Sequence, residues 1–89
     1  MTASIIRRLK AMPNLWWVKI HGGPMQRAGL PDMLIVDNGK AKFIELKAPA
    51  GRVSPLQEVT MAKLRKAGAD AFVIRSIEEF DLYFKKEEK

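Results

Sequence analysis

Two carboxylates and one lysine stand in this sequence where a β-hairpin would bring them together. In the run 42–47, KFIELK, Glu45 and Lys47 are two residues apart, and alternate side chains of a strand share a face. Asp32 begins the preceding apolar run, and the tripeptide 37–39, Asp-Asn-Gly, predicts a hairpin turn between the two runs. Pairing about that turn places Asp32 beside the far end of the second arm, where Glu45 and Lys47 lie.

This set of charges predicts a metal-dependent phosphodiesterase. Buried charges are costly unless they are paired or bind a metal, and two neighbouring carboxylates supply the oxygen ligands that a hard divalent cation prefers. We therefore expect Mg²⁺ at Asp32 and Glu45, with Mn²⁺ able to replace it. Lys47 beside the metal would lower the pKa of a metal-bound water or stabilise charge developing on a phosphate. Each part alone has a structural explanation, as a common Pro-Asp turn or a surface ion pair, but their combination in one basic chain favours the catalytic interpretation.

Gln57 is a fourth candidate for the site. A helix is expected to begin after Ser54, which suits the N-cap position, and Gln57 then shares a helix face with Met61 and Leu64. That face should turn toward the strands, because charged residues occupy the rest of the helix. The alternative is a capping box, since Ser-x-x-Gln has the required spacing. The spacing leaves both interpretations open.

The elements that position these residues follow from hydrophobic periodicity and turn signals. We expect a helix at 4–12, strands at 15–20, 32–36 and 40–47, a helix from 55 to the stop signal at Gly68, a strand at 71–75 and a last helix opened by a capping box at 76–79. The third and fourth strands are joined through a helix, which requires a right-handed crossover and a parallel pair. The prediction is an α/β fold in the order α-β-β-β-α-β-α, with a mixed central sheet flanked by helices. Trp16 and Trp17 are adjacent on a strand and should face opposite sides of the sheet. The simplest expectation is that both are core residues. The alternative for one of them is a dimer contact or stacking on a base.

Composition agrees with a nucleic-acid partner. The 89 residues leave room for one small domain, here taken as 1–89, which pairing with a second copy would help to stabilise. Lys and Arg number 16 against 10 Asp and Glu, a net charge of +6, and Asp32 is the first acid in the chain. Such a surplus favours binding to phosphates, although a solvated surface is the simpler explanation. Cysteine is absent, which excludes disulfides and thiolate sites. Without a membrane-length apolar run or a signal peptide, we expect a cytoplasmic protein with no membrane contact.

Four short motifs carry a resemblance to a known family: GLPD at 29–32, FIELK at 43–47, SPLQ at 54–57, and Gly68 followed by AFV at 71–73. In this order and spacing, over nearly the whole chain, the sequence resembles the VRR-Nuc family. That family is the virus-type replication-repair branch of the PD-(D/E)XK nucleases. The resemblance implies a restriction-endonuclease-like fold and an endonuclease without a small-molecule cofactor.

The resemblance also implies roles for individual residues. The metal would be held by Asp32, Glu45 and the backbone carbonyl of Leu46, while Lys47 assists the attacking water and Gln57 orders the site. Small stand-alone members act as homodimers on branched DNA such as Holliday junctions, which implies DNA repair chemistry and a dimer here. One departure stands out: family members usually carry an acid in the first helix, whereas residues 2–12 contain none, with Ser4 near the expected position. The missing acid counts against a second metal ion in the site.

Several basic residues are candidates for contacts with the DNA backbone. They are Arg7, Arg8, Lys19, His21, Arg27 and Arg52. Strand register decides whether Lys19 points toward the site. Two other functions remain alternatives: a DNA-binding module that kept the fold and lost catalysis, and an interaction module for an acidic protein. The intact set of two acids and a lysine favours the enzyme.

Overall fold

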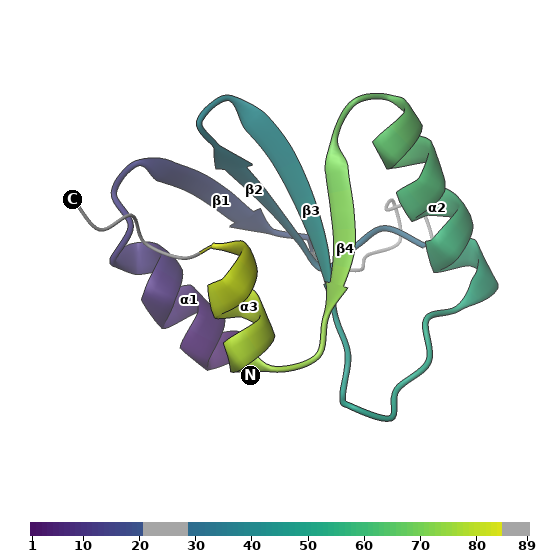
Figure 1. The fold of residues 1–89 in the computed structure, drawn as a ribbon, viewed down its shortest axis with the longest axis horizontal. Coiled ribbons are helices and arrows are strands. Elements are labelled where there is room, and N and C mark those ends of the chain that lie inside the picture. Colours follow the sequence, from purple (N-terminus) through teal and green to yellow (C-terminus); the bar gives the residue numbers. More distant parts are fainter. Residues whose placement is uncertain (21–28, 85–89) are drawn as a thin grey trace.

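The fold is a four-stranded sheet with helices on both faces, seen in a computed structural model that describes residues 1–20 and 29–84 (Figure 1). The predicted element order is confirmed: α1 Thr2–Lys10, β1 Leu15–Lys19, β2 Met33–Asp37, β3 Lys40–Leu46, α2 Pro55–Lys66, β4 Asp70–Ile74 and α3 Ile77–Tyr83. None of the helices in these ranges is long and apolar enough to cross a bilayer.

The sheet has the order β1-β2-β3-β4, with antiparallel pairs β1·β2 and β2·β3 and a parallel pair β3·β4. The predicted mixed sheet and its parallel pair are therefore confirmed. Between β2 and β3 the turn is shorter than expected, because Asp37 still pairs with Lys40. Asn38 and Gly39 alone form it, with φ of 54° and 79°. Two successive left-handed residues match the twist of the flanking strands, so the hairpin has a fixed register.

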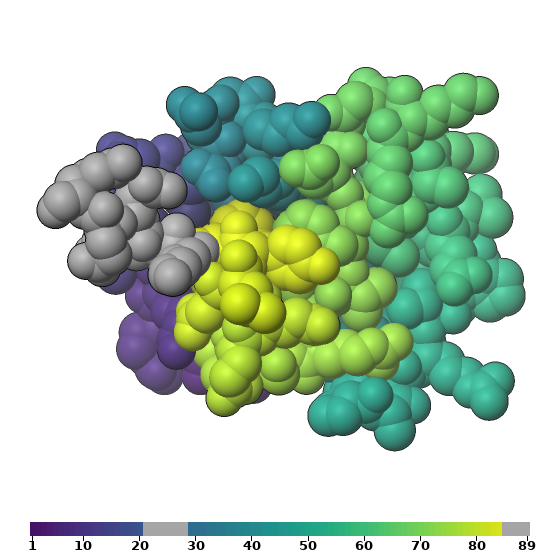
Figure 2. All heavy atoms as spheres, in the orientation of Figure 1, coloured from purple at the N-terminus to yellow at the C-terminus, as the bar shows by residue number. Residues whose placement is uncertain are grey.

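The hydrophobic core lies on the sheet face that α1 and α3 cover. Figure 2 shows α3 in yellow lying across this face. Ile5 and Leu9 of α1 and Phe80 of α3 are buried there. They pack against a row of buried strand residues: Met33, Ile35, Ile44 and Ile74. Because side chains alternate along a strand, Glu45 beside Ile44 must point to the opposite face.

That opposite face carries α2 over β4 and β3. Met61 of α2 is buried against it, and Arg65 Nε donates a hydrogen bond of 2.8 Å to the carbonyl of Ala71 in β4. The helix begins under its predicted N-cap, Ser54, and is followed by Gly68 with φ of 106° as expected. The start of α2 is thereby set over the strand that carries Glu45.

Two predicted boundaries and one predicted burial also need correction. The first helix spans Thr2–Lys10 rather than 4–12, because Pro13 disfavours helical backbone at the residue before it. The last strand is Asp70–Ile74, one residue earlier than predicted. Trp17 packs against the core as expected, but Trp16 is 59% exposed. It lies on the same sheet face as α2 but on the edge strand β1, whereas α2 packs over β4 at the opposite edge.

Candidate active site

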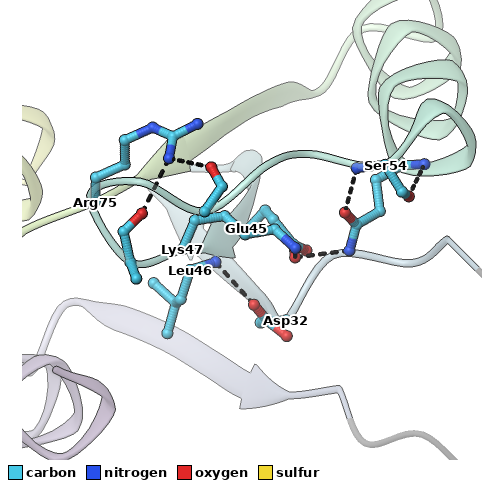
Figure 3. A network of polar contacts seen from close by, with 9 residues as sticks. Asp32, Glu45, Leu46, Lys47, Ser54 and Arg75 are labelled. Atoms are coloured by element: carbon cyan, nitrogen blue, oxygen red, sulfur yellow. Dashed lines mark hydrogen bonds and ion pairs between the residues drawn. The ribbon is translucent and has the colours of Figure 1, made fainter.

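Asp32 lies at the end of the hairpin where the sequence places it, one residue before β2 rather than inside the strand. Its backbone is tied to both neighbouring strands: Asp32 N donates to Ile44 O at 2.9 Å, and Ile20 N donates to Asp32 O at 2.7 Å. Its side chain then reaches across, and Oδ2 accepts a hydrogen bond of 2.8 Å from Leu46 N (Figure 3). The carboxylate of Asp32 is thus fixed beside the end of β3.

Glu45 is the centre of the arrangement. It is only 3% exposed, and no other charged residue in the described ranges is buried. Its Oε2 forms an ion pair with Lys47 Nζ at 3.2 Å and accepts a hydrogen bond from Gln57 Nε2 at 2.7 Å. Its Oε1 is buried and has no hydrogen-bond partner among the described residues. One oxygen is held twice, and the other is left with its full capacity to accept.

The surroundings of Glu45 raise the pKa of its carboxyl group. Burial is the main cause and the negative charge of Asp32 the second, while the hydrogen bond and charge of Lys47 and the hydrogen bond from Gln57 oppose them. The opposing contacts do not cancel the first two. The anion is therefore held in a place that costs free energy, which is common where a carboxylate serves chemistry.

Gln57 satisfies both interpretations of its sequence spacing at once. Its backbone N donates to Ser54 Oγ at 3.1 Å and its Oε1 accepts from Ser54 N at 3.0 Å, which completes the capping box. The same amide turns its Nε2 to Glu45. The cap fixes which way the amide points, so the start of α2 is locked onto the carboxylate of Glu45.

Gly29 brings the loop before Asp32 against α2. Its φ is 87°, and a Cβ added there would stand 2.7 Å from Leu56 Cγ and 3.2 Å from Leu56 O. Such a position accepts only glycine, because a side chain meets both an unfavourable backbone conformation and a clash. The glycine of the GLPD motif therefore has a packing role that spacing alone did not reveal.

The oxygen donors suit a hard divalent cation. Glu45 Oε1 has no hydrogen-bond partner among the described residues, and the charge of Asp32 acts on the Glu45 carboxyl group. The described residues contain no cluster of three His, Cys, Asp or Glu side chains. A site with two carboxylates needs backbone oxygens and waters to complete it, as Mg²⁺ sites commonly do. Within the described ranges, no hydrogen bond or ion pair to Glu45 comes from α1, the helix that lacks an acid.

The basic candidates are not all brought to this site. Arg7 and Arg8 lie on α1, which covers the opposite face of the sheet, and Arg8 pairs with Asp81 of α3 at 2.7 and 3.2 Å. Lys19 pairs in register with Met33, so it lies on the core face and not on that of Glu45.

Arg52 is exposed in the loop that joins Lys47 to Ser54, next to the site along the chain. His21 and Arg27 lie outside the described residues. Of the candidates that the structure describes, Arg52 alone lies in a segment that joins two residues of the site along the chain.

Known proteins share this sequence pattern and this fold. The model of the VRR-NUC domain family matches residues 9–78. The "Fanconi-associated nuclease 1" of Danio rerio is 41% identical over 49 residues, which make up 53% of this chain and only 5% of that protein. A solved structure titled "VRR_NUC domain" matches with a TM-score of 0.74 and 26% identity, over 92% of this chain and 87% of that one. The resemblance inferred from the four motifs is confirmed: the chain belongs to the VRR-NUC domain family.

Proposed function

We propose that this protein is a metal-dependent endonuclease that hydrolyses phosphodiester bonds in DNA. The observation that carries the proposal is the buried Glu45, with Oε2 held by Lys47 and Gln57 and Oε1 unpartnered among the described residues. A carboxylate kept only for structure would have both oxygens satisfied, because unpaired buried polar atoms are costly. Membership in a nuclease domain family supports the same conclusion.

The metal ligands proposed here are Asp32, Glu45 and the backbone carbonyl of Leu46. When bound, Mg²⁺ (or Mn²⁺) would supply Lewis-acid chemistry at the phosphate. The residues themselves orient and charge the site: Leu46 N fixes Asp32, and Gln57 fixes Glu45. The ammonium of Lys47, 3.2 Å from Glu45 Oε2, is placed to stabilise negative charge on the scissile phosphate.

The preferred substrate proposed here is branched DNA such as a four-way junction, bound by a homodimer that presents two sites to two strands. The net charge of +6 supports a polyanionic partner. The alternative is a DNA-binding module that retains the fold without catalysis. The lack of an acid in α1 favours that alternative over any other, since it removes one potential ligand.

The test is cleavage of labelled four-way junction, flap, duplex and single-stranded DNA with Mg²⁺, Mn²⁺ or EDTA. Wild type is compared with Lys47→Ala and with Lys10→Ala, a control that removes the same charge from α1. We expect metal-dependent cutting by wild type and the control, and none by Lys47→Ala, which still binds DNA within about twofold of wild type. Binding that falls together with cleavage would contradict a catalytic lysine. Binding without cleavage under every metal would leave the non-catalytic module.

A further inference from the structure

The loop at 48–53 connects two parts of the candidate site. Lys47 N donates to Ile74 O at 3.1 Å, and after this bond the chain leaves the sheet. The loop ends at Ser54, whose cap fixes Gln57. Lys47 and Gln57 both bind the same oxygen of Glu45. The path of the loop therefore sets how these two side chains lie relative to each other.

One side chain ties this loop to the sheet. Arg75 Nη1 donates to three loop carbonyls, at distances of 3.0, 3.4 and 2.6 Å from Ala48 O, Pro49 O and Gly51 O. Figure 3 shows the guanidinium of Arg75 turned toward the loop. The loop adds a turn of its own, with Gly51 N donating to Ala48 O at 2.9 Å. No other side chain in the described ranges donates to the backbone of 48–53.

Arg75 is itself held in place from behind. It follows β4 directly, and its backbone N donates to Glu79 Oε1 at 2.5 Å, while Glu79 N donates to Ser76 Oγ at 3.1 Å. The capping box predicted at 76–79 is thus only half formed, because the carboxylate of Glu79 takes the N–H of Arg75 instead of that of Ser76. Arg75 is therefore bound through its backbone to the first turn of α3 and through its side chain to the loop. The side-chain contacts are the stronger kind, because a charged guanidinium donates stronger hydrogen bonds than a neutral group does.

A matched arginine shows what a purely structural contact looks like. Arg65 also donates to a backbone carbonyl, that of Ala71, at 2.8 Å, and it joins α2 to the start of β4. In the described structure it donates no hydrogen bond to the loop or to a residue around Glu45. Loss of Arg65 removes one charge and one arginine–carbonyl contact, as loss of Arg75 does, without touching the site.

We propose that Arg75 is a positioning residue, which holds the 48–53 loop so that Lys47 and Gln57 meet at Glu45 in the geometry that cleavage requires. The inference rests on the proposed nuclease function. A small displacement of catalytic groups from outside the reaction centre can cost about 100-fold in rate. Lysine at this position would keep the charge and donate to carbonyls, but without the rigid fork of the guanidinium, so it should restore only part of the activity.

The experiment compares wild type with Arg75→Ala, Arg75→Lys and Arg65→Ala in two measurements. NMR on ¹⁵N-labelled, metal-free protein records hydrogen exchange of the amides at 50–54 and the side-chain amide signal of Gln57. Steady-state cleavage then gives kcat and KM. For Arg75→Ala we expect faster exchange in the loop, a shifted Gln57 signal and a kcat lower by about 10- to 100-fold, with KM within about threefold of wild type. Arg75→Lys should recover part of the kcat, and Arg65→Ala should keep both the loop signals and kcat.

Two results would overturn the inference: unchanged exchange and kcat in Arg75→Ala, or an equal loss of kcat in Arg65→Ala at the same Tm. Failure of the proposed function is separately visible, because wild type would then cleave no DNA. In that case the NMR measurement still decides whether Arg75 holds the loop and Gln57 in place, and an unshifted Gln57 signal in Arg75→Ala would refute it.

Discussion

Glu45 shows the conflict that a buried carboxylate imposes on a small domain. Its charge is buried beside that of Asp32, and the contacts from Lys47 and Gln57 compensate only in part. Removing ions from water is costly, and a close partner repays this cost only with good geometry. With one oxygen unpartnered among the described residues, the metal-free protein should be less stable than a version without this repulsion.

Replacing Asp32 with asparagine should therefore stabilise the metal-free protein. The amide oxygen of Asn can still accept from Leu46 N, which now donates to Oδ2 at 2.8 Å, while the charge that acts on Glu45 is lost. Relief of about 1 kcal/mol would raise Tm by about 4–8 °C in a domain of this size. Thermal melts with EDTA measure this, and melts with Mg²⁺ provide the second arm: wild type should gain Tm from the metal and Asp32→Asn should not. A variant that still gains Tm with Mg²⁺ would refute the metal assignment.

The same pair predicts how stability varies with pH. The pKa of Glu45 is raised above the 4.5 of an unperturbed glutamate, so the folded protein binds this proton more tightly than the unfolded chain does. The contribution of Glu45 to the free energy of unfolding is fully present below pH 4.5 and is lost as the pH rises through the raised pKa of its carboxyl group. The Tm advantage of Asp32→Asn should therefore be largest at neutral pH and shrink on acidification. An advantage that stays constant as the pH falls from neutral to acidic would contradict the coupling of the two acids.

At the scale of elements, the first turn of α2 has two tasks that substitutions can separate. Ser54→Ala removes the hydroxyl that caps the helix but leaves Gln57 Nε2 free to donate to Glu45. Gln57→Glu keeps an acceptor for Ser54 N but cannot donate to Glu45. We expect Ser54→Ala to lose about 1 kcal/mol of stability with little change in kcat, and Gln57→Glu to lose at least about tenfold in kcat. Chemical denaturation and cleavage rates measure the two effects, and a kcat that merely follows stability in both variants would contradict the second task.

The close approach of the GLPD loop to α2 can be tested with two glycines. Gly29 and Gly68 both have positive φ, 87° and 106°, but a Cβ meets Leu56 at Gly29 and nothing within 4 Å at Gly68. Both alanine variants pay for backbone strain, about 1–2 kcal/mol, and only Gly29→Ala adds a clash beside Asp32. It should therefore unfold at lower denaturant than Gly68→Ala, and the added substitution Leu56→Ala should recover part of the difference. Equal stabilities of Gly29→Ala and Gly68→Ala would show that the close approach of Gly29 to α2 does not affect stability.

Local signals explain why much of this arrangement was predictable. The Asn-Gly turn fixes the hairpin register, and Ser54 with Gln57 fixes the start of α2, so the set of Asp32, Glu45, Lys47 and Gln57 follows from short-range spacing. These signals act within a few residues.

Contacts between distant segments had no such signal. The bond from Arg75 to Ala48 spans 27 residues, and nothing near Arg75 in the sequence marks a loop partner. The exposure of Trp16 and the direction of Lys19 likewise depend on which face each helix covers. That choice is made by packing of the whole sheet and not by strand periodicity.

At the scale of the whole molecule, the candidate site residues and the basic residues of α1 lie on opposite faces of the sheet. Asp32, Glu45 and Lys47 lie on the side of α2, whereas the basic residues of α1 cover the other side, with Arg8 already joined to Asp81. Helix α1 therefore does not supply its positive charge at the site. On the proposed function, DNA at the site would meet basic residues from other segments, and the loop with Arg52, which joins Lys47 to Ser54, is one such segment in the described ranges.

This division predicts unequal effects for two exposed arginines. Arg52→Ala should reduce the slope of log K against log salt concentration by about 1, as expected for loss of one phosphate contact, and weaken binding similarly for all DNA sequences. Arg7→Ala removes the same charge from α1 and should leave the slope unchanged, because α1 lies on the far face of the sheet. Fluorescence anisotropy with a labelled four-way junction over a series of salt concentrations measures both. The reverse order would place the DNA on the α1 face, away from Glu45, and would favour a binding module in which the carboxylates take no part.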